Sequence, residues 1–245
     1  MFGKVIYYDE NCINNYSAIM SNKPKLDVPK MELTKGKKVG AEVKAFQAEM
    51  SETKTFEATI QTTLLRDCAE FENMLHGRPD FFDMVESNDF DLSTMERGCI
   101  FKLNGYVAIP EEFDIIQALD KFKTFLPTDT VSQGKEFVDK FLGTQDAKMP
   151  VIIDGTGFPL CSKLNYKSLT IPYEDLQSYE SLEVTILARM IVSNMLRASN
   201  SFFDPLRDFI LLNRQLRRSV ARSEGLREIF SNEDYKNIEV IAMYQ

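Results

Sequence analysis

The chain has 245 residues and a mass of 28.1 kDa, a length that fits one large domain or two smaller ones. Hydrophobic residues make up 44% of it and charged residues 27%, so the composition excludes a disordered, collagen-like or coiled-coil protein. The net charge of −8 gives no overall attraction to nucleic acid or to an anionic membrane, although a local patch of positive charge would.

The first ninety residues are predicted to contain two strands and two helices. β-Branched and aromatic residues at 4–8 predict a strand, and Asp9 then caps a short helix. Small apolar residues alternate with polar ones over 39–45, which predicts a half-buried strand. Over 55–77 the apolar residues recur at intervals of three and four, so this segment is predicted to be a helix with a glycine cap.

An acidic segment comes next, followed by two predicted hairpins. Five acids between 80 and 91 lack the spacing of a calcium loop and indicate a solvated connector. Residues 99–109 predict a hairpin around Asn104-Gly105, because both turn residues tolerate a positive φ. Residues 151–161 predict a second hairpin.

The last third is predicted to be a strand, a helix and a strand. Period-two alternation over 182–192 predicts the first strand. Asp204 is a helix cap followed by Pro205, and the helix is predicted to run to about Phe230. Residues 238–244 predict the closing strand, and a crossover helix of that length permits parallel pairing of the two strands.

Together these elements predict an α+β fold with a mixed sheet. The sheet would hold the β-hairpins and the C-terminal strand-helix-strand unit, with the helices packed on it. The acidic connector is the predicted boundary between an N-terminal strand and helix region, 1–90, and an α+β domain, 91–245. The alternative is a single domain over 1–245.

Rare residue types limit the chemistry that the chain can perform. His76, the single histidine, lies at the end of a predicted helix, where a cation complements the helix dipole, so no Ser-His-Asp or Cys-His site is expected. No CxxC pair occurs among Cys12, Cys68, Cys99 and Cys161, so a zinc site is not expected either. Free thiols are typical of a reducing compartment, and we expect neither a metal nor a cofactor.

Arginine is concentrated near the C-terminus. Of the 11 arginines, 8 lie at position 189 or later. Residues 181–245 consequently carry a net charge of +1, whereas residues 1–180 carry −9.

Three of these arginines form the candidate anion-binding site. Arg207, Arg214 and Arg218 fall close to one face of the predicted final helix. Arginine suits bidentate capture of phosphate, so a nucleic acid or a phosphorylated ligand would bind here. The favoured interpretation is instead a solvated helix face paired with acids such as Asp208 or Glu224.

Two short motifs are similar to enzyme signatures. The motif from Asp154 to Gly157 lacks the uninterrupted Asp-Thr-Gly of an aspartic protease and has no second copy, so it is interpreted as a turn. Asp27, Glu42 and Lys44 resemble the Asp…Glu-x-Lys arrangement of many metal-dependent nucleases, in which two carboxylates hold Mg²⁺.

The opening stretch from Lys4 to Tyr16 resembles the start of an uncharacterised bacterial family, a domain of unknown function in which a VIYYDE strand leads into a short helix. The stretch 38–44 and the EVTILARM strand at 183–190 resemble that family as well. The resemblance covers most of the chain and implies a bacterial cytoplasmic origin. It brings no activity, cofactor or catalytic residue with it.

These observations favour a non-catalytic binding or regulatory protein that acts through a protein partner or self-association. The sequence offers no nucleophile with a base, no metal-ligand cluster and no cofactor fingerprint, so an enzyme is not the favoured interpretation. Because no apolar run is long enough for a signal peptide or a membrane span, we expect a soluble cytoplasmic protein without membrane contact. The alternative is a metal-dependent phosphodiesterase built on Asp27, Glu42 and Lys44.

Overall fold

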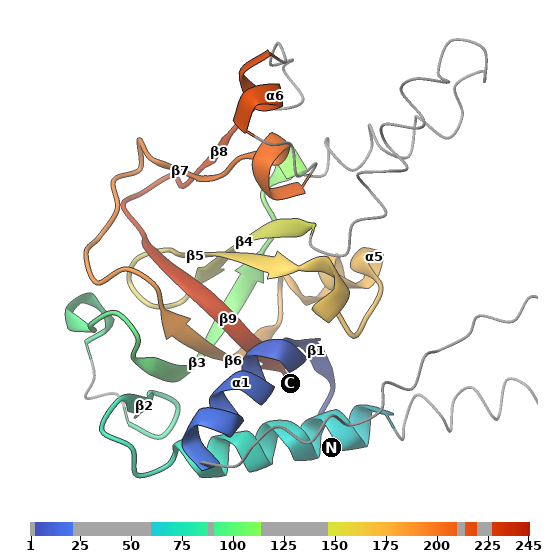
Figure 1. Cartoon of the computed structure of the whole chain (residues 1–245), viewed down its shortest axis with the longest axis vertical. Coiled ribbons are helices and arrows are strands. Elements are labelled where there is room, and N and C mark those ends of the chain that lie inside the picture. Colours follow the sequence, from blue (N-terminus) through green and yellow to red (C-terminus); the bar gives the residue numbers. More distant parts are fainter. Residues whose placement is uncertain (1–2, 22–59, 88–90, 114–146, 210–213, 220–226) are drawn as a thin grey trace, which may run out of the picture.

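The computed structural model describes residues 3–21, 60–87, 91–113, 147–209, 214–219 and 227–245. At its centre is a seven-stranded sheet (Figure 1). Its strands are β1 (Val5–Tyr8), β2 (Phe81–Asp83), β3 (Ile100–Ala108), β4 (Lys148–Asp154), β5 (Leu160–Asn165), β6 (Glu183–Met190) and β9 (Lys236–Tyr244). A separate two-stranded sheet pairs β7 (Ser201–Phe203) with β8 (Ile229–Phe230).

Among the residues that the structure describes, the longer helices lie in the N-terminal third, and the later ones are short. The first two are α1 (Glu10–Ser21) and a helix over 60–75. The short ones are η1 (Leu92–Thr94), η2 (Tyr166–Ser168), α5 (Tyr173–Leu176), η3 (Gln177–Tyr179), η4 (Pro205–Phe209) and α6 (Arg214–Ser219).

Five strands of the large sheet close into a barrel. Antiparallel pairs join β3 to β4 and β4 to β5, after which β5 runs parallel to β9. The circuit closes because β6 pairs antiparallel with both β9 and β3. β1 extends the barrel beside β9, and β2 extends it beside β3. The predicted α+β class with a mixed sheet is confirmed, whereas the closure of that sheet was not predicted.

The predicted hairpin around Asn104-Gly105 is wrong, because both residues lie inside the continuous strand β3. The strand pairs with β6 as far as Tyr106, and its last three residues pair with β4. A Cβ atom on Gly105 would lie 2.8 Å from the carbonyl oxygen of Asp154, closer than packed atoms allow. The glycine therefore permits a close approach of two strands and does not form a turn.

Several local predictions are confirmed. The backbone N–H of Cys12 donates to the Asp9 carboxylate at 2.9 Å, so Asp9 caps α1. The helix over 60–75 ends next to Gly77, which has the left-handed φ of 82°. β4 and β5 form the second predicted hairpin. The strand predicted over 39–45 lies outside the described residues.

The predicted C-terminal unit needs two corrections. Asp204 does begin a helical turn, since its carboxylate accepts a hydrogen bond from the N–H of Leu206 at 3.0 Å. The helix does not run to Phe230, however, because Ile229 and Phe230 form β8. The flanking strands β6 and β9 pair antiparallel, and the parallel partner of β9 is β5.

The predicted acidic connector contains a buried ionic contact. Phe81–Asp83 form β2, and an oxygen of Asp83 lies 3.6 Å from the Nζ of Lys102 on β3. The same Nζ donates to Glu72 of the helix over 60–75 at 2.8 Å. The prediction that Asp83 is solvated is therefore wrong. The network of Lys102, Glu72 and Asp83 attaches the helix over 60–75 to the barrel. The boundary at residue 90 stays a prediction, although β1 and β9 share one sheet.

The hydrophobic core has two parts, separated by the barrel wall. Alternate side chains of the strands fill the barrel, as in Leu103, Val151, Leu164, Ile186 and Val240. Outside the barrel, α1 and the helix over 60–75 pack on Leu187, Ile241 and Ala242 through Ile13, Phe71 and Leu75 (Figure 1). The helices thus cover the outer face of β6 and β9 and leave the outer face of β4 and β5 to other segments.

Candidate functional site

The chain between β6 and β9 crosses the outer face of β4 and β5. In Figure 1 the described parts of this connection, which spans residues 191–235, run up the left side of the barrel and then above it, whereas α1 lies below the barrel. Its β7 strand contacts β5, and η4 contacts β4. Two backbone hydrogen bonds of 2.7 and 2.9 Å join Leu196, near the start of the connection, to Tyr235 at its end. The connection is therefore held against the barrel through β7 and η4, and its two ends are joined to each other.

An aromatic cluster fastens the connection to the chain that leaves β3. The ring of Phe113 lies 5.6 Å from that of Phe203 and 5.3 Å from that of Phe209, both nearly perpendicular to it. Tyr173 contacts Phe113 at 6.2 Å and stacks on Tyr166 at 5.9 Å. Edge-to-face and stacked rings are favourable beyond the area they bury. We call these five residues the aromatic anchor.

Charged side chains gather beside this anchor. The basic cluster comprises Lys148, Lys163, Arg207 and Arg217, together with the acids Asp204 and Asp208. Arg207 donates from Nε and Nη2 to the two oxygens of Asp208, each at 2.7 Å. Lys163 on β5 donates to the same carboxylate at 2.8 Å, and Arg217 on α6 lies 3.8 Å from Asp204. Asp208 thus links the connection to the barrel wall.

The pKa values of this cluster reflect both burial and pairing. Burial alone raises the pKa of Asp208, but hydrogen bonds from Arg207, the N–H of Asp204 and Lys163 outweigh it, so the pKa falls below its ordinary value. Burial lowers the pKa of Lys163 even beside Asp208, and the positive charges of Arg207 and Lys148 lower it further. Burial thus acts on both partners of the Lys163–Asp208 pair, and Glu228 adds a further negative charge near Arg207.

We expect Asp208→Asn to lower the free energy of unfolding by about 2 kcal/mol near neutral pH, because the variant loses charge-assisted hydrogen bonds in a buried site. The folded pKa of Asp208 is depressed, so its stabilisation is present above the ordinary carboxyl pKa and is lost as the pH falls through the folded value. Urea unfolding at a series of pH values should show the two proteins converging in acid. A gap that stays constant across the series would contradict this assignment.

Positive charge is concentrated in the middle of the connection. Residues 197–227 contain seven arginines and three acids, a net charge of +4 in a chain whose total is −8. Arg214 and Arg218, one turn apart on α6, are exposed and form no hydrogen bond or ion pair with a described residue. Lys148 at the start of β4 is also exposed. An anion approaching this face therefore meets exposed cations that form no ion pair with a described residue.

The three arginines of the predicted anion site differ in their surroundings. Arg207 is paired with Asp208, as the favoured interpretation predicted, whereas Arg214 and Arg218 point to solvent. Sequence reasoning missed Lys148 and Lys163, because a lysine at an outward strand position carries no local signal until the strands are paired.

The residues of the predicted nuclease motif cannot be placed in this site. Asp27, Glu42 and Lys44 all lie outside the described residues.

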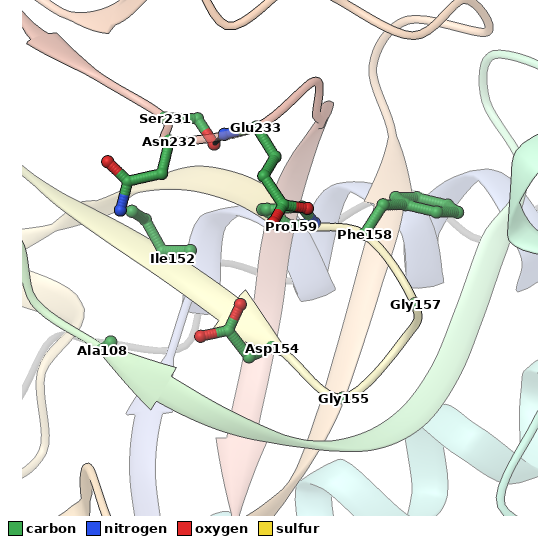
Figure 2. Close-up of a pocket in the computed structure, with 10 residues that line it drawn as sticks. All are labelled: Ala108, Ile152, Asp154, Gly155, Gly157, Phe158, Pro159, Ser231, Asn232 and Glu233. Atoms are coloured by element: carbon green, nitrogen blue, oxygen red, sulfur yellow. Dashed lines mark hydrogen bonds between the residues drawn. The ribbon is translucent and has the colours of Figure 1, made fainter.

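A pocket of about 440 Å³ opens on the same barrel face, at the far end of β4 (Figure 2). Asp154 rises from the end of β4, and Asn232 and Glu233 reach down from the chain before β9. Ile152 and Pro159 supply apolar walls. The motif that begins at Asp154 is a turn, as predicted, with Gly155 at a φ of 112° and Gly157 at 83°.

Comparisons with protein-family models, with curated proteins and with solved structures find no match for this chain. The resemblance of its opening stretch to a bacterial family of unknown function therefore stays a prediction. Within the described ranges, no three histidine, cysteine or acidic side chains are placed to share a metal ion. No helix in that part of the chain has the length and apolar character that crossing a membrane requires.

Proposed function

We propose that this chain is a non-catalytic binding module whose barrel binds single-stranded nucleic acid. The strand would lie along the connection between β6 and β9, beside the part of the β4 and β5 outer face that this connection covers. The main support for the proposal is the position of the basic cluster, which lies on the barrel face formed by β4 and β5. These are the second and third strands of the barrel in chain order. The sequence favoured a protein partner, and the placement of these cations favours a polyanion instead.

The strand order of the barrel supports this assignment. Five strands joined as a partly open Greek-key barrel are the architecture of the OB-fold. That fold binds oligonucleotides or oligosaccharides on the face of its second and third strands and with the loops after its first and fourth strands. Here those strands are β4 and β5, and the connections from β3 to β4 and from β6 to β9 take the places of the two loops in chain order. Because one fold supports many functions, the class of ligand has to be inferred from the side chains on this face.

The side chains on this face favour an oligonucleotide over an oligosaccharide. A sequence-independent single-strand site combines a positively charged groove with aromatic side chains on which bases stack. Arg214, Arg218 and Lys148 supply exposed cations, and Phe230 at the edge of the connection is 47% exposed. Local charge governs such binding, because phosphate contacts release counterions whatever the net charge of the protein.

The test is the binding of a fluorescent thymidine strand of about 12 nucleotides, a length within the usual site size of such barrels. We expect measurable affinity at low salt and a fall in affinity as salt rises. Each lost phosphate contact reduces the log-log salt slope by about 0.7 for a single strand. The variant Arg214→Gln/Arg218→Gln should therefore bind more weakly and show a slope smaller by about 1.4.

The matched control removes two arginines from the helical side of the barrel. Arg66 and Arg78 are exposed there, with 66% and 41% of their side chains accessible. Arg66→Gln/Arg78→Gln changes the net charge equally and should leave the salt slope unchanged. Equal losses in the two double variants, or no binding by the parent protein, would reject the proposed function.

A further inference from the structure

The pocket beside Asp154 lies on the strand that carries the basic cluster. Outward positions along β4 run from Lys148 through Ile152 to Asp154. At roughly 3.3 Å per residue, about 20 Å separate the first from the last. A nucleic acid strand bound on this face, as the proposed function requires, would therefore pass from the cluster to the mouth of the pocket.

The pocket has the size and the walls of a site for one flat aromatic group. Its volume of about 440 Å³ lies within the usual range for small-ligand sites. Ile152 and Pro159 line the space between the two carboxylates and give a planar ring apolar surface to stack on, whereas the ring of Phe158 extends away from that space (Figure 2).

The polar groups of the pocket mainly accept hydrogen bonds. The carboxylates of Asp154 and Glu233 face the same space from opposite sides, and neither forms a hydrogen bond or ion pair with another described side chain (Figure 2). An ionised carboxylate only accepts, whereas the amide of Asn232 both donates and accepts. The group that fits here presents adjacent N–H donors to a carboxylate and a carbonyl oxygen to an amide.

We infer that this pocket binds a guanine base of the bound strand. Guanine alone among the common bases presents two neighbouring donors, N1–H and the N2 amino group, on its Watson–Crick edge. Thymine offers one donor between two carbonyl oxygens. Cytosine and adenine place a ring acceptor next to their amino group, so a carboxylate meets a lone pair there. The inference rests on the proposed function and adds a base preference to it.

The experiment compares three thymidine strands of about 12 nucleotides that differ at one central position, which carries guanine, hypoxanthine or thymine. A good bidentate contact discriminates between bases by roughly five- to a hundredfold, so we expect the guanine strand to bind about tenfold more tightly than the all-thymine strand. Hypoxanthine lacks the N2 amino group and should fall between them. Fluorescence anisotropy at constant salt gives the three dissociation constants.

The variant Asp154→Asn/Glu233→Gln should reduce the guanine preference to about onefold. Removing two negative charges should also strengthen the binding of the all-thymine strand slightly, because repulsion of its phosphates is relieved. The control variant Glu10→Gln/Glu70→Gln changes the same number of exposed acids on the helical side and should keep the preference. If the parent protein and both double variants prefer the guanine strand equally, the role of the Asp154 and Glu233 carboxylates is overturned.

The remaining outcomes separate the pocket from the proposed function. Strands that bind equally well whatever the central base would leave the proposed function standing and overturn the guanine pocket. Failure of every strand to bind would overturn both. The last measurement is the binding of guanosine monophosphate. If this nucleotide binds as tightly as the guanine strand, the pocket is a site for a free nucleotide, and the inference that it binds a base of a bound strand is overturned.

Discussion

Truncating Phe113 to alanine is expected to lower the free energy of unfolding by about 4 kcal/mol. The side chain is fully buried and packs edge-to-face on Tyr173, Phe203 and Phe209. Its removal would leave a cavity between three rings that cannot collapse together without moving the connection between β6 and β9. Urea unfolding of the variant measures this loss directly.

The control for this prediction is Phe230→Ala. Phe230 is 47% exposed on β8, so the same truncation removes little buried surface and should cost less than about 1 kcal/mol. If the two variants lose similar stability, the aromatic anchor does not hold the connection in place.

Weaker binding of the nucleic acid strand is also expected of Phe113→Ala, since Phe209 lies next to Asp208 of the basic cluster.

Replacing Lys236 by methionine should lower the free energy of unfolding by about 3 kcal/mol. Lys236 is 0% exposed, and its Nζ donates to the carbonyl oxygens of Leu92 and Ser93, both at 2.7 Å, and of Met95 at 3.5 Å. Methionine fills a similar volume but removes the ammonium donor from all three carbonyl groups, and the Leu92 oxygen keeps only the N–H of Met95 at 3.3 Å. The loss would appear in chemical denaturation.

Lys4→Met provides the comparison for Lys236→Met. Lys4 is exposed at the start of β1, so the same substitution should change stability by less than about 0.5 kcal/mol. A Lys236 variant as stable as the Lys4 variant would mean that water or a shifted backbone satisfies the three carbonyl groups.

Local signals in the sequence predicted the ends of elements well. Asp9 was identified as a cap and Gly77 as the end of a helix, because each acts within one turn of its own position. Asn104 and Gly105 gave a wrong prediction for the same reason: the dipeptide favours a turn locally, whereas two strands distant in sequence, β4 and β6, decide its conformation. Tertiary pairing overrode the local preference at this point.

The candidate site depends almost entirely on contacts between distant residues. Asp208 meets Lys163 across 45 positions of the chain, and Arg217 of α6 meets Asp204 at the start of η4. The sequence placed Arg207 beside Asp208 because the two are neighbours, but it offered no reason to add Lys148. A lysine gains this role only when the barrel closes and turns its strand toward the connection.

The central place of β9 constrains the order in which the molecule can fold. This strand pairs with β1, β5 and β6, so residues 236–244 complete three pairings at once. During synthesis β1 and β3 to β6 emerge before β9, and until it arrives the edges of β5 and β6 have no partner on that side. Closure over such long sequence separations is typical of folding in milliseconds to seconds. The chain is therefore most exposed to edge-to-edge aggregation in the interval before its final strand docks.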